Sequence, residues 1–173
     1  FMEAYSHAPQ ASFIDLMMDA VFAVDTEANI VYASASCERI LGYTQQEVIG
    51  KNMFDLMLPA DRELTRRSVS EVMSGILQVH FENRYVHKNG QVVHIMWATR
   101  WSEATQLRVG VARDITERKR SESRKAALYA ISEAAYDAED LVKLFQHIHQ
   151  IVGTLLLVDH FSVILYNSET GQM

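Results

Sequence analysis

The side chains best suited to chemistry in this sequence are three histidines that lie close together, His80, His87 and His94. Imidazole titrates near neutral pH and is a common zinc ligand, so the group raises the question of a metal centre or an acid–base site. A shared ion would need all three rings on one face of the structure. Strand parity places His80 and His87 on opposite faces of a sheet, so we predict solvated surface histidines and no metal site.

Sequence patterns that support catalysis are missing. The chain contains no Gly-rich phosphate-binding loop, no nucleophile elbow and no HExxH motif, and its seven glycines are scattered. We therefore predict that these residues are not an enzyme. We expect any catalytic domain of a parent protein to lie beyond Met173.

A second group of candidate residues combines a few polar side chains with apolar ones, as ligand pockets do. Parity points Asn83 and Tyr85 inward, and the candidate pocket comprises Phe22, Val24, Met53, Met57, Met73, Phe81, Asn83, Tyr85, Ile95 and Trp97. An amide among apolar groups can orient a small molecule. It can equally be satisfied by a backbone group or a water, and the methionines can simply fill the core. Both interpretations stay open, and an unknown small molecule remains compatible with the sequence.

Composition and charge limit the classes of partner. The formal net charge of −6 gives no attraction to nucleic acid or to an anionic membrane surface. The single cysteine, Cys37, rules out an internal disulfide framework and fits a reducing compartment. No apolar run reaches the roughly 18 residues of a membrane-spanning helix. The sequence therefore indicates a cytoplasmic segment without nucleic-acid or membrane contacts.

The elements that must position these residues begin with a short helix over 13–19 and two strands, over 21–24 and 30–33. Ser34 is expected to cap a following helix that buries Cys37 on one side. A longer helix is predicted from Pro59 to about Ser74, with inward side chains at Leu64, Val69, Val72 and Met73.

Three more strands follow, over about 77–87, 91–101 and 107–113. Two strands, three helices and three strands in this order are typical of an α+β fold. We predict a five-stranded antiparallel sheet with its helices on one face.

The turn before Gly90 decides which side chains face the core. A two-residue loop would pair Tyr85 with His94, whereas a three-residue loop with Gly90 in the left-handed conformation pairs Tyr85 with Val93. A slip of one residue moves every side chain to the other face. Only the three-residue loop gathers the apolar side chains on one face, so we predict an inner face made of Val79, Phe81, Asn83, Tyr85, Val93, Ile95 and Trp97.

The last strand passes directly into a charged helix within 108–120. Asp114 and Glu117 have the spacing of a capping box, in which each side chain satisfies a backbone N–H at the helix start. A strand joined to a helix without slack transmits movement of the sheet. We therefore predict that the signal leaves the sheet through Asp114, Ile115, Thr116 and Glu117.

The outward face of the sheet is also partly apolar, through Val86, Val92, Met96, Ala98, Val109 and Val111. A sheet with two apolar faces needs a second cover, which the segment 1–11 or a second subunit can supply. We predict a homodimer.

The remainder of the chain starts with the polar run ERKRSESRK, which predicts an exposed helix. A strand is predicted over 161–167, after a second helix that carries Leu141, Leu144, Phe145, Ile148, Val152 and Leu155 at helical spacing.

Residues 13 to about 117 resemble a PAS sensor domain. The matching segments are FAVD…NIVYAS, ERILGYTQQEVIGKNMFDLMLPAD, RYVHKNGQVVHIMWATR and VGVARDITERKR, the last of which holds the family's Asp-Ile-Thr exit motif. Residues 126–171 resemble the opening of a GAF domain, without that family's ligand pocket. The resemblance implies a flanking segment 1–12, a PAS domain 13–117, a helical linker 118–136 and a truncated GAF-like start 137–173.

The resemblance also bears on cofactors. Light-sensing PAS domains bind flavin through an Asn-Cys-Arg-Phe-like run, and here Met53 stands where the reactive cysteine would be. A thioether cannot form the flavin adduct. Haem-binding members take a histidine from the long helix, and residues 60–74 contain none. We therefore predict no cofactor.

The function implied is a sensory module that relays a small-molecule or conformational signal to downstream domains of the same polypeptide. The pairing of PAS and GAF domains is typical of bacterial sensor histidine kinases and diguanylate cyclases. The alternatives are a ligand-free scaffold for protein interaction and dimerisation and, third, a haem or flavin sensor.

Overall fold

The computed structural model describes residue 14, residues 17–137 and residues 141–156, and the chain divides into two compact units, Phe1–Thr116 and Glu117–Met173. The predicted strand over 161–167 and most of the predicted helix over 13–19 lie outside the described residues.

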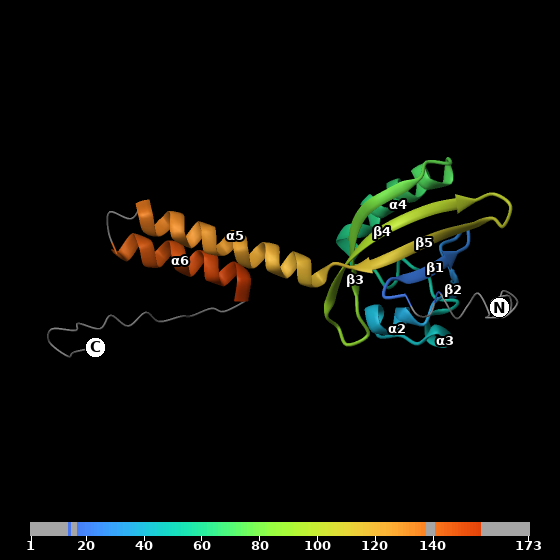
Figure 1. The fold of residues 1–173 in the computed structure, drawn as a ribbon, viewed down its shortest axis with the longest axis horizontal. Helices are drawn as coiled ribbons and strands as arrows, with labels where there is room; N and C mark the ends of the chain where they lie inside the picture. Colours follow the sequence, from blue (N-terminus) through green and yellow to red (C-terminus); the bar gives the residue numbers. More distant parts are fainter. Residues whose placement is uncertain (1–13, 15–16, 138–140, 157–173) are drawn as a thin grey trace, which may run out of the picture. The chain divides into compact units, whose positions relative to one another are not determined.

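The first unit is built on a five-stranded antiparallel sheet (Figure 1). Its strands are β1 (Ala20–Val24), β2 (Ile30–Ala33), β3 (Gln78–Val86), β4 (Val92–Ser102) and β5 (Leu107–Asp114), arranged in the order β2-β1-β5-β4-β3. Between β2 and β3 the chain forms α2 (Ser36–Leu41), α3 (Gln45–Val48), the 3₁₀ turn η1 (Pro59–Asp61) and α4 (Arg62–Met73). The predicted α+β fold is confirmed.

The register between β3 and β4 follows the three-residue loop. Tyr85 pairs with Val93 and Phe81 with Trp97, and Gly90 has a φ of +88°. The amide of Gly90 donates to the carbonyl of His87 at 2.7 Å, which closes the turn. Because glycine has no Cβ, it adopts this left-handed conformation without a steric penalty.

A bulge in β3 turns one residue of the predicted inner face away from the core. The pairing shifts between Gln78 and Phe81, and His80 takes a φ of +66°. A bulge adds one residue to one strand and reverses the alternation before it. Val79 is consequently 54% exposed and does not face the core.

The core lies between the sheet and its helices. Its fully buried side chains include Phe22, Ile30, Cys37, Ile40, Leu41, Val48, Met57, Tyr85 and Ile95. The predicted burial of Cys37 is confirmed.

Ser34 does not cap α2, contrary to the prediction. The residue at the cap position is Ala35, and no side chain caps the helix there. The Oγ of Ser34 accepts instead from the amide of Val21 at 2.9 Å. This bond ties the end of β2 to β1, so the serine supports the sheet.

The helix α4 is rotated relative to the prediction. Thr65, Ser68 and Val72 form its buried face, whereas Leu64 and Met73 are 55% and 37% exposed. The Oγ1 of Thr65 donates to the backbone carbonyl of Asp61 at 2.8 Å. The polar side chains therefore face the sheet because they find partners there, and two of the predicted inward residues face solvent.

An ion pair fixes the start of α4 to the edge strand β3. Asp61 accepts from the backbone amide of Arg84 at 2.8 Å, from its Nε at 3.0 Å and from its Nη2 at 2.6 Å. The side chain of Asp61 is only 12% exposed. These hydrogen bonds to Arg84 hold the pKa of Asp61 below its usual value.

The second unit contains α5 (Thr116–Asp137) and α6 (Leu141–Leu156). Residues 117–125 are mostly exposed, and the pairs Glu117–Arg120 at 2.8 Å and Arg118–Glu122 at 3.8 Å lie along α5. The predicted exposed helix is confirmed. In the part of the chain that the structure describes, no helix is long and apolar enough to span a membrane.

The substitution Asp61→Asn tests the ion pair. Loss of the charge should lower the free energy of unfolding by about 1.5–3 kcal/mol near neutral pH, the range for hydrogen bonds to charged groups. Because the pKa of Asp61 is lower in the folded chain, its contribution is complete above the unfolded pKa of about 4 and is lost as the pH falls through the folded pKa.

Urea unfolding of the wild type and the variant at about pH 7 and about pH 3 measures this difference. The gap should narrow at the lower pH. The exposed Asp55, changed to Asn, is the matched control. An Asp61→Asn variant as stable as the wild type at neutral pH would contradict this assignment.

Candidate functional site

A cavity of about 50 Å³ lies between the inner face of the sheet and the helical side of the first unit. One water needs roughly 10–15 Å³ on this scale, so the space holds several waters or a small molecule. Its apolar lining is Phe22, Val24, Met53, Phe54, Val69, Val72, Phe81 and Trp97. Its polar lining is Thr65, Ser68, Gln78, Asn83, Tyr85, Thr99 and Arg108, and Gly110 completes the wall.

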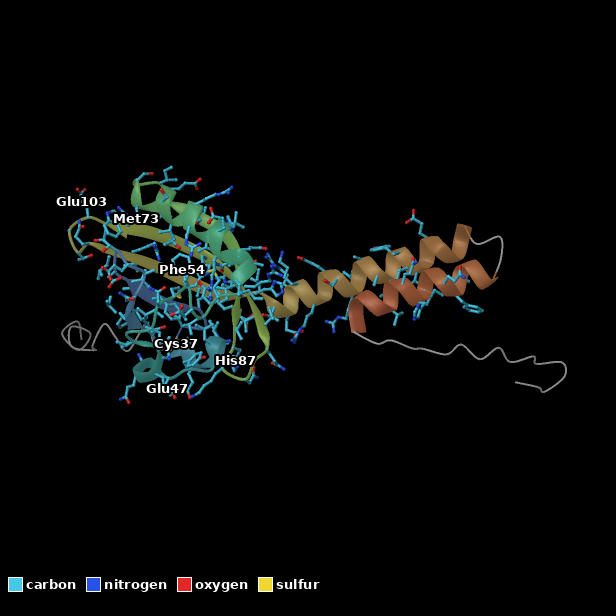
Figure 2. All side chains as sticks on the ribbon, turned by 180° about the vertical axis from the view of Figure 1, so that it is seen from behind. Cys37, Glu47, Phe54, Met73, His87 and Glu103 are labelled. Carbon is cyan, nitrogen blue, oxygen red and sulfur yellow. The ribbon has the colours of Figure 1, made fainter. Side chains whose placement is uncertain are left out.

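The cavity includes most of the predicted pocket residues. Phe22, Val24, Met53, Phe81, Asn83, Tyr85 and Trp97 line it. Met57 and Ile95 are buried in the core beside it and are not part of its wall. Met73 is the last residue of α4 (Figure 2). Its side chain faces solvent because the helix is rotated away from the predicted orientation.

Asn83 is held by protein groups on both ends of its amide. The Nε1 of Trp97 donates to Asn83 Oδ1 at 2.9 Å, and Asn83 Nδ2 donates to the Oγ1 of Thr65 at 3.1 Å. The amide thus connects β3, β4 and α4. Of the two interpretations left open by the sequence, these bonds favour the structural one for Asn83.

Aromatic rings form one wall of the cavity. The ring of Trp97 lies 5.7 Å from that of Phe22 and 5.8 Å from that of Tyr85, both in tilted arrangements. Such contacts add to the stabilisation from burial. Burial raises the pKa of Tyr85, so its phenol stays protonated and can donate a hydrogen bond.

The sequence analysis missed Arg108, which lines the cavity and is only 8% exposed. Burial lowers the pKa of its guanidinium, although the nearby Tyr85 and Asp25 oppose this shift. The alternation of residues along β5 could have predicted this placement. Arg108, Gly110 and Ala112 face inward, and they alternate with Val109 and Val111. The prediction used the valines of this strand and overlooked the arginine.

Gly110 keeps this part of the cavity open. A Cβ at this position would lie 3.1 Å from Cε3 of Trp97 and 3.3 Å from Oγ1 of Thr99. These distances are shorter than ordinary carbon contacts, so a side chain would crowd the space between β4 and β5.

The histidines and the cysteine lie apart from the cavity lining. His80 is exposed at the bulge, and Cys37 is buried in α2, where its Sγ donates to the carbonyl of Tyr43 at 3.4 Å. Over residues 14, 17–137 and 141–156, no group of three His, Cys, Asp or Glu side chains is arranged to hold a metal.

The exit from the sheet is held by backbone bonds to β4. The amide of Ile115 donates to the carbonyl of His94 at 2.9 Å, and the amide of His94 donates to the Oγ1 of Thr116 at 3.0 Å. Ile115 is 5% exposed. The first residue of α5 is therefore tied to the strand beside β5.

The predicted capping box of Asp114 and Glu117 is not formed, because α5 begins at Thr116 and Ile115 holds the cap position. Asp114 Oδ1 accepts from the amide of Thr116 at 2.8 Å. Glu117, however, accepts from Nη1 of Arg120 at 2.8 Å. The amide of Ile115, at the cap position, already has the carbonyl of His94 as its acceptor.

The substitution Asn83→Leu tests the role of the amide. It leaves the indole N–H of Trp97 without its acceptor in a buried place, which should cost about 1–3 kcal/mol of the free energy of unfolding. A double-mutant cycle with Trp97→Phe, measured by urea unfolding, should give a coupling free energy of about 0.5–3 kcal/mol between the two positions. Trp101→Phe, on the same strand, is the matched control and should not couple. Additive effects of Asn83→Leu and Trp97→Phe would refute the bond's contribution.

Comparison with known proteins places this geometry in a family. Residues 30–112 match the family described as PAS fold. The PAS domain of a Colwellia psychrerythraea protein is 28% identical, with a TM-score of 0.54, over 62% of this chain and 94% of that chain. The PAS domain of the Cronobacter turicensis quorum-sensing receptor RpfR, in complex with BDSF, is 25% identical, with a TM-score of 0.51, over 58% of this chain and 96% of that chain.

A curated relative indicates the kind of protein in which such a domain occurs. The probable diguanylate cyclase DgcE of Escherichia coli K12 is 31% identical over 104 residues, which are 57% of this chain. The match spans only 9% of the length of that relative. Taken with the five-stranded sheet, these likenesses show that the first unit has the PAS fold, which is the fold of sensory domains typical of signal-transduction proteins.

Proposed function

We propose that this chain detects a small molecule in the cavity of its PAS domain and relays the signal through Asp114, Ile115 and Thr116 to a downstream output domain. The observation that carries the proposal concerns β5. Arg108 and Gly110 line the cavity from this strand, and the same strand ends at Asp114, where the exit begins. A ligand in the cavity would therefore contact the same strand, β5, that leads into the exit.

Movement of β5 has a direct route to α5. The exit residues Ile115 and Thr116 both bond to the backbone of His94 on β4, next to β5. Trp97 and Thr99, also on β4, line the cavity. A ligand that favours one relative position of β4 and β5 would thereby bias the start of the helix, as a population shift between two states.

The comparisons support a ligand in general terms. The similar PAS domain of RpfR is in complex with BDSF, which supports the proposal of a ligand for this chain. The DgcE relative supports an output domain that is a diguanylate cyclase or, by the family resemblance, a sensor histidine kinase. In this proposal the catalytic step belongs to another part of the parent protein.

For the second unit we propose a helical linker over 118–136 and the opening of a GAF domain from residue 137. Support comes from α6, whose apolar residues recur at helical spacing and include Leu144, Phe145, Ile148 and Val152. A helix with one apolar face needs further elements to cover it.

A second candidate function, a ligand-free dimerisation scaffold, is favoured by the outward face of the sheet. Val92 and Val109 are 41% and 40% exposed there, and Met96 and Val111 are half-buried. We propose that this face mediates a homodimer, which is compatible with either function.

Native mass spectrometry of the purified 173-residue chain separates the two functions. The sensory function predicts a small molecule that leaves on denaturation, at one copy per PAS domain. A polypeptide whose native mass contains no added molecule, even after incubation with cell extract, would favour the scaffold. Visible absorption of the same sample would instead indicate a haem or flavin.

The substitution Asp114→Ala tests the relay. It removes the acceptor of the Thr116 amide, and we expect faster hydrogen exchange at Thr116 with the sheet still folded. In the full-length parent protein the output should no longer respond to the signal. The exposed Asp55, changed to Ala, is the matched control. Normal regulation in Asp114→Ala would exclude the carboxylate from the relay.

A further inference from the structure

Arg108 is a buried cation for which no hydrogen bond or close ion pair of the side chain is found among the described residues. It is 8% exposed, and its side chain lines the cavity from the inner face of β5. Among the residues that the structure describes, no carboxylate oxygen lies within 4.0 Å of its nitrogens, and no acceptor receives a hydrogen bond from them. Guanidinium carries five N–H donors and stays protonated, so the side chain can donate to a molecule in the cavity.

The other arginines bound to the sheet show what such a group normally requires. Arg84 has Asp61 at 2.6 Å and Arg113 has Asp19 at 2.7 Å, and both arginines are more exposed than Arg108. Burial of an ion without its counter-ion is destabilising. Among these three arginines, Arg108 is the least exposed and the one for which no ion pair within 4.0 Å is found among the described residues.

The nearest negative charge does not fill this role. Asp25 is close enough to raise the pKa of Arg108, yet its oxygens are occupied in the turn before β2. Oδ1 accepts from the amides of Glu27 and Asn29 at 2.9 and 2.8 Å, and Oδ2 accepts from Asn29 Nδ2 at 3.0 Å. The side chains that the structure describes around the cavity include no carboxylate.

The lining of the cavity is of two kinds. The first part is polar and comprises the guanidinium of Arg108 with the side chains of Thr65, Ser68, Gln78, Asn83, Tyr85 and Thr99, and the second is apolar and includes Phe22 and Trp97. A carboxylate fits the first part, since arginine binds it through two parallel hydrogen bonds. A short hydrocarbon fits the second.

We propose that the ligand is a small organic carboxylate whose charged group pairs with Arg108 and whose apolar part contacts the aromatic wall. This inference rests on the proposed function, namely that the cavity is a ligand site. The cavity of about 50 Å³ restricts the ligand to a small acid.

Binding of short monocarboxylates to the 173-residue chain tests the inference. The probes are acetate, propionate, butyrate and valerate, each compared with the primary amide of the same length, in ligand-observed NMR titrations. We expect at least one carboxylate to bind at least tenfold tighter than its amide, a difference of about 1.4 kcal/mol. Arg108→Met should remove this preference and leave amide binding unchanged.

Two controls accompany the variant. Arg100→Met, at an exposed position on the outward face, should bind like the wild type. Arg108→Lys keeps the charge and should retain part of the preference, so it replaces Arg108→Met if that variant does not fold. The comparison of acid with amide in the wild type needs no variant at all.

The outcomes separate this inference from the function on which it rests. If acids and amides bind with equal affinity, the proposal of a carboxylate ligand is overturned, whereas the proposed function of the cavity as a ligand site is retained. An Arg108→Met variant that keeps the preference would overturn the role of Arg108. If no acid and no amide binds, the result contradicts both the proposed carboxylate ligand and the proposed ligand site.

Discussion

The register between β3 and β4 is the constraint on which the rest of the first unit depends. The turn closed by Gly90 pairs Phe81 with Trp97 and Tyr85 with Val93. This register puts Asn83 on the inner face within reach of the indole of Trp97 and the hydroxyl of Thr65. A slip by one residue would carry these side chains to the outward face and leave the buried bonds between sheet and helix unmade.

The cavity is a consequence of the polar contacts between α4 and the sheet. Because Thr65 bonds to Asn83, and Ser68 to Gln78, the helix presents small side chains to the core. Leu64 and Met73, which are large enough to fill the space, face outward. The absence of a side chain at Gly110 keeps the opposite wall back. A hydrophobic contact surface on α4 would give a better-filled core and no cavity.

β5 combines two tasks that a signalling domain must connect. Its inner residues border the cavity, and its end is continuous with the start of α5. The bonds of Ile115 and Thr116 to His94 keep the exit attached to β4 as well. The same strand holds Arg108, so the proposed ligand contact and the proposed relay belong to one element.

The sequence by itself determined the strands, the α+β class with an antiparallel sheet and the turn register, because alternation, turn residues and helical spacing are local properties of the chain. The strand order β2-β1-β5-β4-β3 became known only from the structure. Parity placed Phe81, Asn83, Tyr85 and Trp97 on the inner face once the register was known, and all four line the cavity. Tertiary structure decided the rotation of α4, the bulge at His80 and the bond of Ser34 to β1, since each depends on a partner far along the chain. Tertiary structure also decided the burial and the pairing of Arg108. The alternation of β5 points this side chain inward, but only the packed structure shows that no carboxylate among the described residues meets it there, because burial and pairing depend on all the surrounding elements.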